Sequence, residues 1–366
     1  YLDLPYPDPG QRAAFWREGF AGFPSPPPEE LGDRLRLTGG YIQRVALQAR
    51  SLALMAGRSR VDFDDVRRAS QALNRHHLEP LALRVEPWGT WNDLLVNEIT
   101  ARDLDELETR CRHRELLVAA SGPAFQGSLT RGVRALFNGP TGTGKTLAAR
   151  ILAAELGMDL YRVDLAAVVD KYVGETEKRL DRLLSRAEEL DVILLLDEGD
   201  ALLTGRTDVH SANDRYANLE TNFLLQRMEA YEGIFVVTTN AGSRIDSAFQ
   251  RRFDAVVSFP SPGPQERLGI WKIHLPDAHL VDDAALQRLA TRTTLTGGQI
   301  RNAALFATLL SVEAGRGGAV RLDDVERSLQ REYRKAGASF PRAQTSEEAA
   351  HASVARKVDD LLEGLR

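Results

Sequence analysis

The chain has 366 residues, of which 43% are hydrophobic and 27% are charged, and its formal net charge is −5. This is the composition of an ordinary globular protein, and its length predicts two or three domains. The acidic balance gives no global basic field of the kind that recruits nucleic acid. The single cysteine excludes an intrachain disulfide and favours a reducing cytoplasm, and no apolar run approaches the roughly 18 residues of a membrane span.

The beginning of the chain reads as a small helical domain that recurs near the end. LPYPDPGQRAAFW (4–16) parallels FPSPGPQERLGIW (259–271), and LTGG and DDV follow in both places in the same order. Two generic helical hairpins would not share this proline spacing and this order of motifs. We therefore predict two copies of one helical domain, at 1–78 and 261–337.

Between the copies, a lead-in at 79–130 precedes a region in which strands and helices alternate. The lead-in contains an amphipathic helical pattern at about 99–119. Apolar strands are expected at 133–138, 160–163, 192–196, 235–239 and 255–259, with helices at 146–156 and 175–190. Continuous apolar strands that alternate with helices indicate a parallel sheet covered on both faces, so we expect an α/β domain at 131–260. A polar tail with a short charged helix follows at 338–366.

The segment GPTGTGKT, from Gly139 to Thr146, fits the phosphate-loop pattern G-x-x-x-x-G-K-[ST]. Its glycines allow backbone N–H groups to surround phosphate oxygens, and the helix that follows points its positive end at the anion. Lys145 is one of only six lysines in a chain that otherwise uses arginine. We expect its ammonium to bridge the β- and γ-phosphates of a nucleotide, and the Thr146 hydroxyl to bind Mg²⁺.

The segment VILLLDEGD places two acidic residues at the end of a buried strand. In open α/β sheets, ligands bind at this edge. We expect Asp197 to hold the coordination shell of Mg²⁺ and Glu198 to act as the general base that polarises the attacking water.

The phosphate loop and this acidic strand end resemble those of the AAA+ ATPases, in the branch of protein-remodelling modules. The resemblance covers about 88–335. It implies a P-loop NTPase fold, with a five-stranded parallel sheet in the order 5-1-4-3-2 and an α-helical lid, and an ATP site at the subunit interface of a ring that is usually hexameric. The nucleotide contacts that it implies come from Gly139, Pro140, Thr141, Gly142, Thr143, Gly144, Lys145, Thr146, Leu147 and, in the lid, Gly298.

Further positions follow from the same resemblance. VVTTN resembles sensor 1, in which the amide of Asn240 would orient the water and the γ-phosphate. DSAFQRRFD resembles the arginine-finger segment, so Arg251 or Arg252 would reach the γ-phosphate of the neighbouring subunit; this segment is shorter than the usual form, and both arginines stay candidates. LTGGQIRNA resembles sensor 2, which implies a role for Arg301.

The first helical copy differs at the sensor 2 position, where Gln43 stands in the place of Arg301. The chain also opens at Tyr1 without Met. We expect that the first copy is the lid of a truncated first module that lacks this sensor, and that 131–337 is an intact second module.

A last motif distinguishes between functions. Lys171, Tyr172 and Val173, followed by glycine, resemble the first pore loop of protein unfoldases, which grips an extended peptide with an aromatic and an aliphatic side chain. A nucleic-acid translocase would favour basic residues here. The sequence therefore predicts a cytoplasmic ATP-hydrolysing ring motor that remodels or threads a protein. An ATP-switched assembly scaffold without threading and a nucleic-acid motor are the alternatives.

Overall fold

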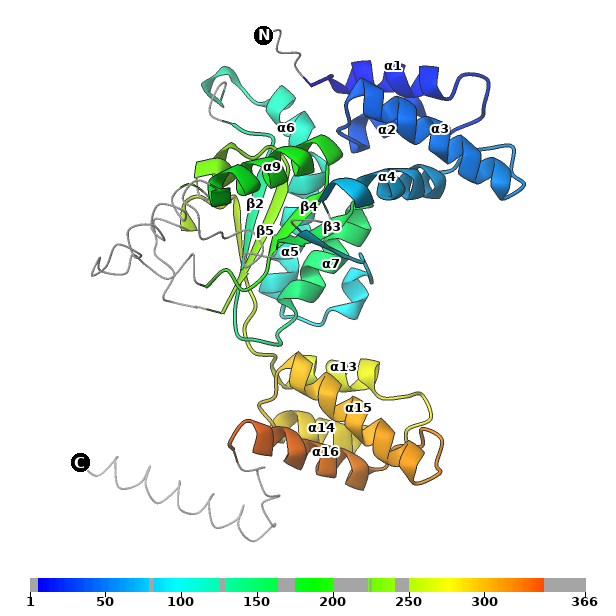
Figure 1. Cartoon of the computed structure of the whole chain (residues 1–366). Helices are drawn as coiled ribbons and strands as arrows, with labels where there is room; N and C mark the ends of the chain where they lie inside the picture. Colours follow the sequence, from blue (N-terminus) through cyan, green and yellow to red (C-terminus); the bar gives the residue numbers. More distant parts are fainter. Residues whose placement is uncertain are drawn as a thin grey trace, which may run out of the picture. The chain divides into compact units, whose positions relative to one another are not determined.

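The computed structural model describes residues 6–78, 82–125, 129–163, 175–200, 223, 226–240 and 250–338. The chain divides into two compact units, Tyr1–Ser261 and Pro262–Arg366 (Figure 1). Within the described ranges, no helix has both the length and the apolar character needed to cross a membrane.

The first unit opens with a helical domain made of α1 (Pro9–Gly19), α2 (Pro28–Arg34), α3 (Gly39–Met55) and α4 (Phe63–Leu78). A capping box starts α1: the Asp8 side chain accepts a hydrogen bond from the backbone N–H of Gln11, and the Gln11 side chain accepts one from the N–H of Asp8. The fully buried Trp16 stacks on Phe20, with 5.6 Å between the ring centroids. These aromatic rings anchor α1 in the core of the helical domain.

The rest of the first unit is built around one six-stranded sheet. Its strands are β1 (Ala82–Val85), β2 (Val133–Asn138), β3 (Leu160–Val163), β4 (Ile193–Leu196), β5 (Ile234–Thr239) and β6 (Ala255–Ser258). The order is β1-β3-β4-β5-β2-β6, and all neighbours are parallel except β1, which runs antiparallel to β3. The five parallel strands confirm the predicted order 5-1-4-3-2. The sixth strand, β1, was not predicted.

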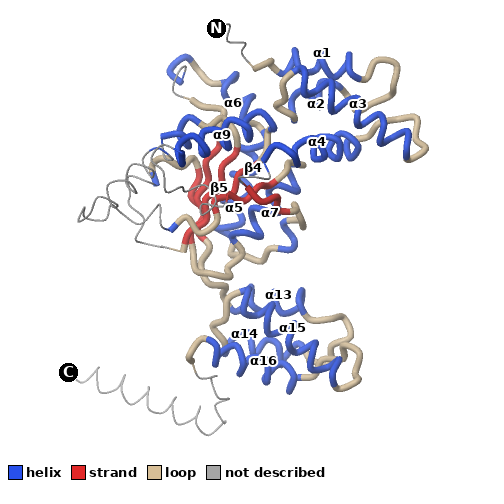
Figure 2. The backbone as a smooth tube through the Cα atoms, in the orientation of Figure 1, coloured by secondary structure: helices blue, strands red, loops and turns tan. Residues whose placement is uncertain are grey.

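Helices cover both faces of the sheet, as predicted (Figure 2). Successive side chains of a strand point to opposite faces. In β4, Ile193 and Leu195 join one apolar cluster with α5 (Glu98–Arg112) and α7 (Lys145–Leu156). Leu194 and Leu196 join the other cluster, with α9 (Glu175–Leu190) and the first helical domain. The sheet is therefore the middle of three layers, and its predicted continuous apolar strands are buried on both sides.

The helical pattern predicted at about 99–119 is wrong as a single helix, because α5 ends at Arg112 and a separate α6 (Arg114–Ala120) follows. At the junction, the N–H of His113 still donates to the carbonyl of Thr109, but its ψ of 16° ends the α-helical backbone. Arg114 is buried just after this break and pairs with Asp191. Short 3₁₀ helices at Trp91–Asp93 and Pro123–Phe125 complete the described elements of the lead-in.

Buried ion pairs join the first helical domain to the α/β layers. The backbone N–H of Arg36 donates to Asp191 Oδ2 over 2.9 Å, and Arg114 pairs with the other oxygen of the same carboxylate. Arg12 of α1, which is 1% exposed, pairs with Glu115 of α6. The helical domain and the α/β layers thus form one compact unit.

Helix α4 and strand β1 are tied to the sheet by one further carboxylate. Asp159, which is 4% exposed just before β3, accepts hydrogen bonds from Asn74 Nδ2 over 3.1 Å and from Arg84 of β1. Tyr41 donates in turn to the carbonyl oxygen of Asn74. This network holds the edge strand β1 and the end of the first helical domain against the same carboxylate.

The described part of the second unit consists of α13 (Pro264–His274), α14 (Asp283–Arg292), α15 (Gly297–Glu313) and α16 (Leu322–Lys335). The buried arginines of the repeat share two corresponding backbone partners in the two copies. Arg12 Nε donates to the carbonyl of Gly32 over 2.8 Å, and Arg267 Nε donates to that of Ala290 over 2.7 Å. Each arginine also donates to the proline carbonyl five residues before it. The two repeated sequences therefore form domains with the same internal construction.

Candidate nucleotide site

The candidate site lies where the carboxyl ends of β2, β4 and β5 meet. The phosphate loop follows β2 and leads into α7, Asp197 follows β4, and Asn240 follows β5. Because these three strands are parallel neighbours, their carboxyl ends share one edge of the sheet. The predicted loop, acidic residues and sensor are thereby brought to one place.

The backbone of the phosphate loop needs glycine at specific positions. Gly142 and Gly144 have φ angles of 80° and 106°, in the region that other residues rarely adopt. A Cβ atom on Gly139 would lie 2.0 Å from the carbonyl oxygen of Phe259. The loop therefore passes close against the chain that follows β6, and α7 begins directly after Gly144 without a side-chain cap. An anion is the natural acceptor for the N–H groups of this first turn.

The side chain of Lys145 is folded over this loop. Its ammonium donates to the carbonyls of Gly139 over 2.6 Å and Pro140 over 2.8 Å, and to Asn240 Oδ1 over 2.9 Å. The residue is only 7% exposed, and this burial lowers the pKa of Lys145, against the opposing effect of nearby carboxylates. The site thus holds a cation whose three hydrogen bonds can be exchanged for phosphate oxygens.

Thr146 and Asp197 place a hydroxyl and a carboxylate side by side. Thr146 Oγ1 donates to Asp197 Oδ1 over 3.2 Å, and Thr238 Oγ1 donates to the same oxygen over 2.6 Å. Oxygen ligands of this type suit Mg²⁺, which binds through one or two carboxylates together with phosphates and water. The donor set therefore fits the ion that the sequence predicts.

Glu198 occupies an unusual backbone conformation. Its φ is +56°, which costs about 1–2 kcal/mol for a residue other than glycine. Thr238 holds this turn: its hydroxyl accepts the N–H of Glu198 over 3.0 Å, and its carbonyl accepts the N–H of Gly199 over 2.8 Å. The turn leaves Glu198 exposed at the edge of the sheet, where a base would have to meet water.

Sequence reasoning missed Asp200. Its Oδ1 accepts hydrogen bonds from the hydroxyl of Thr239 and from the backbone N–H of Asn240, the latter over 2.8 Å. The motif DEGD contains this third acid, and TTN ends the neighbouring strand. The order of the strands, taken together with these two motifs, could have indicated the pair.

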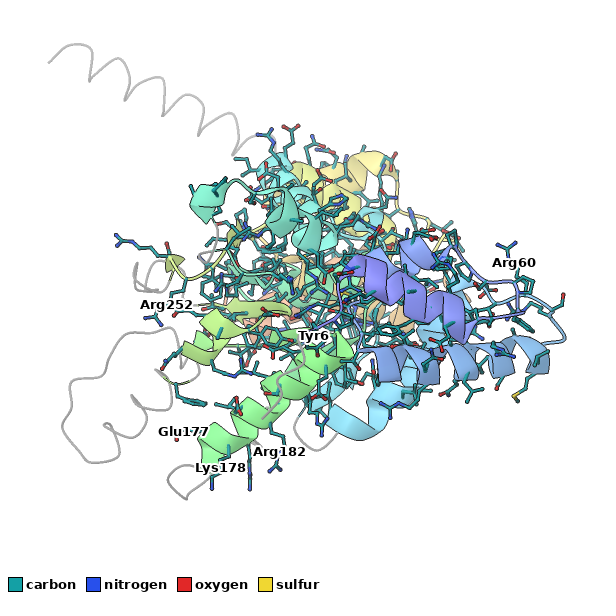
Figure 3. The ribbon with its side chains drawn as sticks, turned by 90° about the horizontal axis from the view of Figure 1, so that it is seen from above. Tyr6, Arg60, Glu177, Lys178, Arg182 and Arg252 are labelled. Atoms are coloured by element: carbon teal, nitrogen blue, oxygen red, sulfur yellow. The ribbon has the colours of Figure 1, made fainter. Side chains whose placement is uncertain are left out.

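Neither of the two candidate finger arginines makes a hydrogen bond or ion pair with the described phosphate loop of its own chain. Arg252 pairs with Glu229 over 3.1 Å and lies at the surface (Figure 3). Arg251 is exposed and pairs with no residue in the part of the chain that the structure describes.

The remaining predicted residues belong to other parts of the chain. Arg301 is exposed on α15 of the second unit, and Gly298 is in the first turn of that helix. Lys171, Tyr172 and Val173 lie outside the described residues. Helix α9 begins at Glu175, directly after them, and Glu177, Lys178 and Arg182 project from it in Figure 3.

Comparison with known proteins finds a family model that matches the part of the chain around this site. The model of the family "ATPase family associated with various cellular activities (AAA)" matches residues 135–261. The chain is 35% identical over 215 residues to the ATP-dependent zinc metalloprotease FtsH of Rhodothermus marinus, a match that covers 56% of the chain and 30% of that protein.

Two other relatives are similar over slightly more than half of the chain. It is 35% identical over 217 residues to ATPase family gene 2 protein of Schizosaccharomyces pombe, with 54% of the chain and 26% of that protein covered. It is 29% identical over 204 residues to the proteasome-activating nucleotidase of Methanosphaerula palustris, with 54% of the chain and 49% of that protein covered. The chain thus spans half or less of the length of these relatives.

Among the described residues, no group of three or more His, Cys, Asp or Glu side chains could hold a metal ion.

Proposed function

We propose that this chain hydrolyses ATP to ADP and phosphate in a ring of identical subunits, and that it uses the reaction to remodel a protein. The match of residues 135–261 to the AAA ATPase family supports this proposal. The observation that carries the proposal is the joint placement of Lys145, Thr146, Asp197 and Asn240 at one edge of the sheet. These side chains come from three strand ends and are linked by hydrogen bonds of 2.9 and 3.2 Å.

In the proposed reaction, the phosphate loop binds the nucleotide through its backbone N–H groups and the start of α7. Lys145 exchanges the carbonyls of Gly139 and Pro140 for β- and γ-phosphate oxygens. Thr146 and Asp197 would hold Mg²⁺ with its water shell, and the bound ion would supply positive charge against the phosphates. Asn240, released by Lys145, faces the space next to the γ-phosphate.

Glu198 takes a proton from water as the oxygen of that water bonds to the γ-phosphorus. The bond from this phosphorus to the bridging oxygen breaks, and ADP leaves. The φ of +56° at Glu198 supports this role, since strained backbone at a strand end is maintained where a side chain must be aimed. The Thr238 hydroxyl keeps that turn in place.

The ring is proposed to be hexameric, with a finger from one subunit completing the site of the next. Arg251 is the better candidate, because Arg252 is already paired with Glu229 in its own chain. Mixing Lys145→Ala subunits with Arg251→Ala subunits tests this idea. Hydrolysis should reappear at interfaces that combine an intact loop with an intact finger; assembled mixed rings without any recovery would contradict it.

The substrate is proposed to be a protein that Tyr172 grips in a central pore. This proposal rests on the KYVG motif, and on relatives whose names include proteases and proteasome-activating nucleotidases. Tyr172→Ala should keep basal ATP turnover and abolish the unfolding of a tagged fluorescent protein substrate. Unfolding that survives the substitution would favour an ATP-switched scaffold. We propose a cytoplasmic location, since the lone cysteine allows no intrachain disulfide.

The domain organisation that we propose is the lid of a preceding module at 1–78, a lead-in at 79–130, an ATPase core at 131–260, its own lid at 261–337 and a tail at 338–366. The matching arginine contacts in the two helical copies support this arrangement. Gly298 and Arg301 belong to the second copy.

A further inference from the structure

The side-chain amide of Asn240 is held from two sides. Its Oδ1 accepts a hydrogen bond from the Lys145 ammonium over 2.9 Å, and its Nδ2 lies 3.5 Å from Asp200 Oδ2. An ammonium can only donate and a carboxylate can only accept. The amide therefore has one orientation that satisfies both neighbours, with the oxygen towards the phosphate loop and the NH₂ group towards Asp200.

Asp200 is itself fixed by the strand that carries Asn240. Its Oδ1 accepts the hydroxyl of Thr239, which is fully buried, and the backbone N–H of Asn240. The hydroxyl of the preceding residue, Thr238, donates to Asp197 and accepts the backbone N–H of Glu198. Two consecutive threonines of β5 thus hold the acidic turn after β4 at two points, which sets the position of Asn240 against that of Glu198.

We propose that Asp200 is a positioning residue that makes Asn240 an acceptor for the attacking water. This inference rests on the proposed function. When Lys145 turns to the phosphates, the freed end of the amide is its oxygen, because the NH₂ group stays with Asp200. The water then donates one proton towards Asn240 Oδ1 and the other to Glu198. Two acceptors use both protons, so that a lone pair of the water oxygen faces the γ-phosphorus as the new bond forms.

The test is Asp200→Asn in the full assembled chain. In the variant, the backbone N–H of Asn240 and the hydroxyl of Thr239 donate to the oxygen of the amide introduced at position 200. The NH₂ group of this amide then faces the NH₂ group of Asn240. We expect the Asn240 amide to flip and kcat to fall at least about tenfold, roughly the effect of one misplaced hydrogen bond, with Kd for ATP and ADP within about twofold. Asp181→Asn on α9, where the carboxylate is 57% exposed, is the matched control and should match the wild type.

A second substitution separates positioning from a structural role. In the double variant Asp200→Asn/Asn240→Asp, the donor and acceptor exchange places, and the carboxylate at position 240 again offers an oxygen to the water. Its kcat should exceed the product of the two single effects by about tenfold or more.

Three outcomes would overturn the inference. The first is a kcat of Asp200→Asn equal to that of Asp181→Asn. The second is a kcat of the double variant equal to the product of the two single effects. The third is a loss of kcat in Asp200→Asn that comes with a similar fold loss of nucleotide affinity and with a lower Tm. An assembled wild-type protein without any ATP turnover would refute the proposed function itself, and this inference with it.

Discussion

Replacing Arg36 with threonine tests whether the first helical domain is a fixed part of the ATPase core. Threonine is the residue of the second copy, since Thr294 stands at the corresponding position. Arg36 is 2% exposed, pairs with Glu232, approaches Glu115 to 3.5 Å, and lies 4.4 Å above the ring of Tyr6. Tyr6 lies beside α9 in Figure 3, so this one guanidinium joins several elements of the unit.

The expected loss of stability follows from these contacts. Breaking a fully buried ion pair costs about 3–5 kcal/mol. Here the cost is lower, because Glu232 is 44% exposed and Glu115 keeps Arg12 as a partner. Each weakened pair then contributes about 1 kcal/mol and the cation–π contact about another 1 kcal/mol. The total of about 3 kcal/mol corresponds to a fall in Tm of about 6–12 °C for a unit of this size.

Thermal and urea unfolding, followed by circular dichroism, measure this loss. Arg17→Thr is the matched control, because Arg17 and its partner Glu29 are 61% and 67% exposed and this substitution should leave the unfolding curve unchanged. If Arg36→Thr unfolds at the temperature of the Arg17→Thr control, the helical domain is not held to the core by these buried charges.

Other expectations concern single residues of the core and the site. Burial raises the pKa of Cys111 to about 12 from 9.0, so at pH 9 iodoacetamide should label the folded protein about five hundredfold more slowly than the unfolded chain. Because the thiol of the unfolded chain ionises at a lower pH than that of the folded protein, the free energy of unfolding should also fall as the pH rises above 9. Rapid labelling of the folded protein would contradict the burial of Cys111. Gly139→Ala should abolish binding of a fluorescent ATP analogue, since its Cβ meets the Phe259 carbonyl at 2.0 Å, and normal affinity would show that the loop can yield. Arg251→Ala should lower turnover in the assembled ring about 10³-fold or more and Arg252→Ala much less, and the reverse order would reassign the finger.

The parallel part of the sheet could be predicted because its strands are continuous apolar runs. Strands β2 and β3 have the predicted bounds, and the others differ by one residue at an end. At the end of β6, Phe259 leaves the strand and packs its ring 5.2 Å from that of Phe137. Strand β1 could not be found in this way, since it is only partly buried and Leu83 within it is 52% exposed.

The features that escaped prediction depend on pairs of residues that are distant in the chain. Arg36 and Asp191 are 155 positions apart, and Asp200 and Asn240 are 40 positions apart. No local pattern alone marks such a contact, because it depends on how distant segments of the chain pack against one another. By contrast, the phosphate loop carries its chemistry in eight consecutive residues, 139–146, and could be recognised directly.

The central claim is that this chain hydrolyses ATP with Glu198 as the base. The most direct measurement compares steady-state phosphate release from Mg²⁺–ATP by the assembled wild-type protein and by Glu198→Gln, with nucleotide binding measured on the same samples. We expect both proteins to bind ATP with similar Kd, and the turnover of the variant to be lower by about 10²–10⁴-fold. Equal turnover by the two proteins, or wild-type protein that binds ATP without releasing phosphate, would contradict the account.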